Sequence, residues 1–218
     1  MGCNLRRMIV MALVAVVGGA GGWLPVKTAV AQRSGLTITP FVGGYIPLKP
    51  LGELDFPLAG ITTTVTADLK TGPAFGGKLT LMPGGKRFGV EGTYFYASSK
   101  TRIRVSLLGR EDDATVQGGS LKALFRATDG KTDTDVIFSA GVSGTTRSGD
   151  VFRLAQAVDQ FDIGGVVGLG LHLILSPQVT FRLDGDLSLY KWNWRGSLPN
   201  TSQADLLITA GLGLKLGR

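Results

Sequence analysis

Cysteine and histidine are almost absent from this 218-residue chain, which has one of each, Cys3 and His172. A single cysteine excludes an internal disulfide framework and a zinc site built from cysteines. Beyond the first 31 residues, no stretch of the sequence is apolar for long enough to form a transmembrane helix, which needs about 20 residues. The chain also lacks a clustered basic face, so we expect no nucleic-acid partner.

The first 31 residues have the features of a signal peptide. Arg6 and Arg7 precede an uncharged apolar run at 8–20, and residues 29–31 (Ala-Val-Ala) are small where a signal peptidase reads the chain. We therefore expect cleavage before Gln32, which leaves one mature domain at 32–218. The alternative, an uncleaved anchor helix, is disfavoured because the apolar run is shorter than the roughly 20 residues that span a bilayer.

Glycine is the most unusual feature of the composition, because 33 of 218 residues is about twice the ordinary ~7%. Three of the 23 basic residues and none of the 16 acidic ones lie in the leader, so the mature net charge is a mild 20 − 16 = +4. Hydrophobic residues make up 44% of the chain and they alternate with polar ones. A membrane protein without apolar helices must be a closed barrel, which pairs all of its backbone groups internally.

Period-two alternation predicts eight strands, at 36–47, 73–82, 87–98, 117–128, 134–143, 161–175, 179–190 and 204–216. The predicted connections alternate in length. Three are tight turns, at 83–86, 129–133 and 176–178, and four are long polar loops, at 48–72, 99–116, 144–160 and 191–203. This asymmetry predicts an all-β, eight-stranded antiparallel up-and-down transmembrane barrel, with the short turns and both termini on the periplasmic side.

One face of the last three runs carries no charge. In the run 179–190, the residues Val179, Phe181, Leu183, Gly185, Leu187 and Leu189 alternate with Thr180, Arg182, Asp184, Asp186 and Ser188. A charge-free face suits lipid, where Arg or Lys at the midplane costs about 2–4 kcal/mol. The alternative is a soluble barrel or sandwich with its apolar face inward. Glycines mixed with long charged residues on the polar face favour a narrow barrel interior, because glycine on a solvated face only weakens a strand.

Two strands and one turn resemble a known group. The run 39–47 (Thr-Pro-Phe-Val-Gly-Gly-Tyr-Ile-Pro), the turn Pro-Gly-Gly-Lys at 83–86 and the closing run 208–216 are similar to small bacterial outer-membrane barrels of the OmpA, OmpX and OmpW kind. This resemblance implies a monomer in the bacterial outer membrane, in contact with lipid and lipopolysaccharide and handled by periplasmic chaperones and the assembly machinery. It implies a non-catalytic role in envelope integrity or adhesion. The alternative role is a narrow pore or lateral channel for small apolar molecules.

The parity of the strands predicts ten charged residues on the lumenal face. Five are basic and five acidic: Lys78, Glu91, Lys122, Arg126, Asp162, Arg182, Asp184, Asp186, Asp205 and Lys215. A buried charge without a partner is very costly, so a balanced set predicts an interior network of ion pairs. The alternative is a charged constriction that lines a pore, but the interior of an eight-stranded barrel is just wide enough to be filled by side chains.

We expect no catalytic residue, no cofactor and no metal site. Outer-membrane lipid deacylases pair a strand histidine with a serine two residues later on the same face, and this chain has Ile174 in that position after His172. His172 is also predicted near the periplasmic end, hydrogen-bonded to a carboxylate. The pair Asp184 and Asp186 lies beside Arg182, which favours membership of the network over an acid–base dyad.

The predicted loop 99–116 has basic residues that suit phosphate groups of lipopolysaccharide: Lys100, Arg102, Arg104 and Arg110. A solvated loop tip is an equally good interpretation, and alternation from 101 to 107 predicts that the hairpin extends above the membrane. Tyr94, Tyr96 and Phe88 are expected on the lipid face as parts of aromatic girdles. The parity of Tyr190, Trp192 and Trp194 is lumenal, and the sequence leaves open whether they form a girdle or a rim.

Overall fold

The computed structural model describes residues 35–58, 61–83, 86–105, 108–128, 133–149, 161–192 and 201–216. The chain divides into two units, Met1–Gln32 and Arg33–Arg218, and the described residues all belong to the second. The expected signal peptide at 1–31 lies outside the described residues. Within the described part of the chain, no helix is long and apolar enough to cross a membrane.

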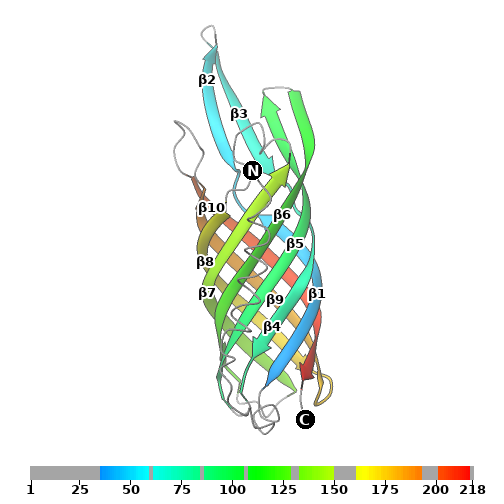
Figure 1. Ribbon diagram of the computed structural model, residues 1–218. Helices are drawn as coiled ribbons and strands as arrows, with labels where there is room; N and C mark the ends of the chain where they lie inside the picture. Colours follow the sequence, from blue (N-terminus) through cyan, green and yellow to red (C-terminus); the bar gives the residue numbers. More distant parts are fainter. Residues whose placement is uncertain are drawn as a thin grey trace, which may run out of the picture. The chain divides into compact units, whose positions relative to one another are not determined.

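Ten strands form one antiparallel sheet (Figure 1): β1 (Leu36–Pro47), β2 (Gly52–Leu58), β3 (Ile61–Leu69), β4 (Gly72–Leu81), β5 (Phe88–Val105), β6 (Leu108–Arg126), β7 (Thr134–Gly149), β8 (Phe161–Ile174), β9 (Val179–Trp192) and β10 (Thr201–Leu216). Eight of them close into a barrel in the order β1-β4-β5-β6-β7-β8-β9-β10, because β10 pairs with β1 and β5 pairs with both β4 and β6. This closed barrel confirms the fold class predicted from the alternation.

The eight predicted strands correspond to the eight barrel strands, but three of the predicted loops are partly wrong. The segment 48–72 contains β2 and β3, most of 99–116 is paired strand in β5 and β6, and β7 continues to Gly149. The alternation at 101–107 predicted that β5 continues upward, and its pairing with β6 up to Val105 and Leu108 agrees with that prediction. The sequences of β2 and β3 also alternate, but they were assigned to a loop. Trp194 lies outside the described residues, and so do 193–200 around it.

The β2–β3 hairpin extends the sheet beyond the barrel. β3 pairs with the upper part of β5, from Leu69 opposite Thr101 to Val65 opposite Val105, and β4 pairs with the lower part of the same strand. Between Leu69 and Ala74 the β3–β4 side has one more residue than the β5 side, which is a β-bulge. β2, β3, β5 and β6 therefore form a four-stranded extension above one side of the barrel (Figure 1).

The outside of the barrel is apolar. Val42, Ile163, Val167 and Leu169 are each at least half exposed, although they belong to regular strands of a closed sheet. The aromatic side chains Phe88 (68%) and Tyr94 (52%) also face outward, as predicted. Charged side chains occupy the interior instead. The soluble-barrel alternative is therefore wrong, because a water-soluble barrel places its apolar face inward.

An arginine in the centre of this apolar surface should destabilise the barrel. For Val167→Arg, in the middle of β8, we expect the free energy of unfolding in lipid vesicles to fall by about 2–4 kcal/mol, because the charge must enter hydrocarbon. Ser148→Arg, near the upper end of β7, is the control and should cost about 0–1 kcal/mol. Urea titrations followed by tryptophan fluorescence measure both values. Equal costs at the two positions would contradict the assignment of this surface to lipid.

Candidate functional site

Six charged side chains in the lumen form a closed ring in which positive and negative groups alternate. Around the ring the order is Lys78, Asp184, Arg182, Glu91, Lys122 and Asp186, and the successive N···O distances, including the closing one back to Lys78, are 2.8, 3.3, 2.6, 3.1, 2.7 and 3.5 Å. Every member is at most 7% exposed. Each charge thus has two partners of opposite sign, and we call this set the charge ring.

The charge ring is electrically neutral, with three cations and three carboxylates. Removing such groups from water costs several kcal/mol for each ion, and only close partners of opposite sign offset that cost. Further hydrogen bonds complete the arrangement: the Thr80 hydroxyl donates to Glu91 Oε2 (2.7 Å), and Arg182 Nη1 donates to Thr80 Oγ1 (2.8 Å). The interior at this level is therefore filled by a network of paired charges.

His172 lies on the edge of the charge ring. Its Nε2 is 3.0 Å from Asp184 Oδ1, and the residue is 9% exposed. In the sheet it is opposite Arg182 on β9 and Asp135 on β7. The structure therefore places this histidine beside a carboxylate, as the sequence predicted.

A second buried group surrounds Arg147 of β7, which sequence reasoning missed. Its guanidinium contacts Asp162 Oδ2 (3.0 Å), Asp205 Oδ2 (2.8 Å) and the Tyr190 hydroxyl, and it lies 4.9 Å from the centre of the Tyr190 ring. The hydroxyls of Tyr45 and Tyr190 both donate to Asp205 Oδ2, each at 2.5 Å. We call these five residues the arginine cluster. Tyr190 is therefore a lumenal residue rather than part of a girdle.

The structure brings eight of the ten predicted lumenal charges into these two groups and leaves two outside. Arg126 is partly exposed at the lower end of β6, where its Nε is 3.2 Å from Asp135 Oδ2. Lys215 is exposed, one residue before β10 ends. These two residues therefore belong to neither group, because they lie near strand ends, and Arg126 pairs there with Asp135 instead.

Glycines on the lumenal face of β8 make room for the charge ring. A Cβ atom on Gly168 would collide with the Asp186 carboxylate and the Ser139 hydroxyl. A Cβ atom on Gly170 would collide with the Asp184 carboxylate and crowd the His172 ring. The mixture of glycines and long charged residues thus reflects a narrow interior, in which a side chain on one strand occupies the space that its neighbour leaves open.

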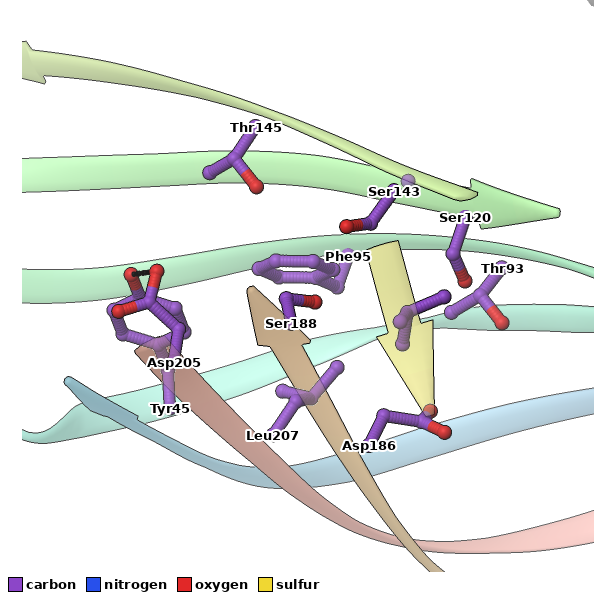
Figure 2. Close-up of a pocket in the computed structure, with 12 residues that line it drawn as sticks. Tyr45, Thr93, Phe95, Ser120, Ser143, Thr145, Asp186, Ser188, Asp205 and Leu207 are labelled. Carbon is purple, nitrogen blue, oxygen red and sulfur yellow. Dashed lines mark hydrogen bonds between the residues drawn. The ribbon is translucent and has the colours of Figure 1, made fainter. Parts of the chain in front are cut away.

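A compact apolar group adjoins the arginine cluster and shares Tyr45 with it. Its members are Tyr45, Leu51, Leu69, Ala74, Ala97, Ala114, Val116 and Leu207. Between the charge ring and the arginine cluster lies a small cavity of 20 Å³ (Figure 2). Such a volume holds about one water molecule. Among the described residues we find no group of three His, Cys, Asp or Glu side chains that could hold a metal ion.

The predicted lipopolysaccharide-contacting residues lie on the extension. The Arg102 guanidinium and the Lys70 ammonium both contact Glu111 Oε1 at 2.6 Å, and all three side chains are about one-third exposed. Lys100 is exposed and lies opposite Asp113 in the sheet. The backbones of Arg104 and Arg110 lie in β5 and β6, but their side chains are outside the described part of the structure.

The comparisons with known proteins agree with the fold. No protein-family model and no curated protein sequence matches the chain. The crystal structure of the outer membrane protein OprG from Pseudomonas aeruginosa is similar, with a TM-score of 0.59 and 17% identity, over 86% of this chain and 99% of that one. Neisserial surface protein A gives a TM-score of 0.53 and 13% identity, over 84% and 98%. The chain therefore shares the fold of solved outer-membrane barrels.

Adding one methyl group beside the charge ring should disturb it. For Gly168→Ala we expect the free energy of unfolding to fall by about 1–3 kcal/mol, since the Asp186 carboxylate must move away from its lysine partners. Gly165→Ala on the same strand is a matched control, because only the Gly141 carbonyl oxygen lies within 4.0 Å of its new methyl group. Urea titrations of the two variants in vesicles measure the difference. Equal stability would contradict a closely packed ring.

Acid should release the contacts of Glu111 only at very low pH. Hydrogen bonds from Lys70 and Arg102 lower the pKa of Glu111 from its ordinary 4.5 to about 2. Because the folded-state pKa is the lower one, the stabilisation is complete above pH 4.5 and is lost as the pH falls toward 2. NMR titration of the Glu111 side-chain carbon measures this pKa. The double variant Lys70→Gln/Arg102→Gln should raise it, whereas Lys100→Gln should leave it unchanged.

Proposed function

We propose that the protein is an integral outer-membrane barrel with a plugged lumen, which serves envelope integrity or presents its extracellular strands for adhesion and catalyses no reaction. The observation that carries this proposal is the charge ring. Together with the arginine cluster it fills the interior with paired groups, and the cavity between the two groups holds about one water molecule. An interior packed in this way offers no continuous route for hydrated ions.

The extension gives the proposed surface role a physical basis. Four strands continue past the barrel wall, so the described residues at that end form an ordered sheet. Lys70, Arg102 and exposed Lys100 supply cationic groups on this sheet, beside the carboxylates of Glu111 and Asp113. We propose that these cations contact phosphate groups of lipopolysaccharide, and that the apolar outer wall contacts lipid in a monomeric barrel.

A second candidate function is a narrow or lateral route for small apolar molecules. The apolar group around Leu51, Leu69 and Val116 favours it, because this part of the lumen would suit an apolar solute if it opened. Against this route stands the adjoining arginine cluster, whose charged groups an apolar solute would have to pass. Uptake of an apolar dye into vesicles that contain the barrel, compared with empty vesicles, distinguishes the two functions.

The plugged lumen predicts the conductance of the barrel and the effect of breaking the charge ring on its stability. The unmodified barrel should show little or no steady conductance in planar bilayers. Asp184→Ala removes one carboxylate from between Lys78 and Arg182, and breaking a buried pair costs about 3–5 kcal/mol of unfolding free energy. Thermal unfolding in detergent should show a lower midpoint for this variant.

Lys215→Ala is the control, because Lys215 is exposed, and it should change neither property. A large, ion-selective conductance in the unmodified protein, combined with an unchanged midpoint for Asp184→Ala, would contradict the plugged lumen. That pair of results would favour the transport function instead.

The absence of catalysis is tested at the histidine. His172 contacts Asp184 and belongs to the edge of the charge ring, so we expect His172→Ala to leave the acyl chains of lipid A unchanged in cells that express the protein. Mass spectrometry of extracted lipid A measures the acylation pattern. A pattern that differs between cells with and without the unmodified protein, and that reverts with His172→Ala, would support a lipid enzyme.

A further inference from the structure

The cavity between the charge ring and the arginine cluster has polar groups in its wall. Six of its lining residues carry hydroxyl groups: Tyr45, Thr93, Ser120, Ser143, Thr145 and Ser188. Asp186 of the charge ring lies with Thr93 and Ser120 at one end, and Asp205 of the arginine cluster lies with Tyr45 at the other (Figure 2). A cavity lined by apolar groups stays dry, whereas a polar one of this size takes up water.

One of these hydroxyls has an unmet hydrogen-bonding requirement. Thr93 is 8% exposed, and its Oγ1 has no hydrogen-bond partner among the described residues. A buried polar group without a partner costs roughly 1–3 kcal/mol, so such groups are almost always paired with protein or with ordered water. The unpartnered Thr93 hydroxyl therefore indicates a ligand inside the barrel that can accept or donate a hydrogen bond.

The size and charge of the cavity restrict what that ligand can be. Its 20 Å³ admits about one water molecule and excludes any organic solute. A cation is disfavoured because both carboxylates already have cationic partners, Lys122 at 2.7 Å from Asp186 and Arg147 at 2.8 Å from Asp205. Water is the remaining candidate ligand, since a buried water needs two to four polar partners and the cavity wall supplies more than that.

We propose that this cavity is a built water site, in which an ordered water molecule bonds the Thr93 hydroxyl and connects the charge ring to the arginine cluster. The water lies between the two groups of buried charges, with Asp186 at one end of its cavity and Asp205 at the other. The lumen is then closed to ions and still contains a hydrated centre.

Radiolytic hydroxyl-radical labelling tests the proposal, because a bound water produces radicals that modify the buried side chains next to it. The chain offers two matched pairs. Val166 and Leu207 line the cavity, whereas Val116 and Leu124 do not, and all four are at most 6% exposed. In the full barrel in detergent, we expect modification of Val166 and Leu207, with little or none of Val116 and Leu124.

Two variants of the anchoring hydroxyl complete the test. Thr93→Val keeps the shape of the side chain and removes the hydroxyl, so modification of Val166 and Leu207 should drop to the level of the control residues Val116 and Leu124. Thr93→Ser keeps the hydroxyl and should retain the labelling. Equal, low labelling of all four residues in the unmodified protein would overturn the water site. Equal, high labelling would overturn it as well, because bulk water would then fill the lumen.

Discussion

A charge taken out of water must meet charges of opposite sign, and the interior of this barrel is organised around that requirement. The charge ring satisfies this requirement, since each of its six charged groups contacts two groups of opposite sign. Such a ring needs its side chains at fixed positions, because a displaced carboxylate would remove one of the two partners of each neighbouring cation. The glycines of β8 follow from this, since larger residues at Gly168 or Gly170 would push the carboxylates away.

The barrel wall separates two environments, and the sequence alternates between them. Outward positions must be apolar because a charge in hydrocarbon costs about 2–4 kcal/mol. Inward positions tolerate charge only in pairs. These two rules act on alternate residues, which is why strand parity alone predicted the members of the charge ring, from Lys78 on β4 to Asp186 on β9. Parity gives the face of a side chain but not its partner, so the order around the ring required the structure.

The same reasoning explains what the sequence did not reveal. Arg147 falls in a stretch whose outward neighbours are Thr146 and Ser148, so no apolar alternation marks it as part of a strand. β2 and β3 were also assigned to a loop, although both sequences alternate apolar with polar residues. They pair with each other and with the upper part of β5, outside the circle of eight strands that closes the barrel. Alternation identifies a strand but not its partner, so this extra hairpin required the structure.

Buried ion pairs contribute little net stability, because well-packed apolar residues of similar size often do as well or better. In this barrel the buried ion pairs fix the register of the strands. The charge ring takes residues from β4, β5, β6 and β9, and the arginine cluster takes them from β1, β7, β8, β9 and β10, so together they include all eight barrel strands. The outer faces, rich in Leu, Val and Gly, would meet lipid almost equally well after a shift of two residues. A shift of one residue would turn the charges outward into hydrocarbon, and a shift of two would separate each carboxylate from its cation. The polar interior therefore specifies the one alignment of the eight strands that the apolar exterior leaves undetermined.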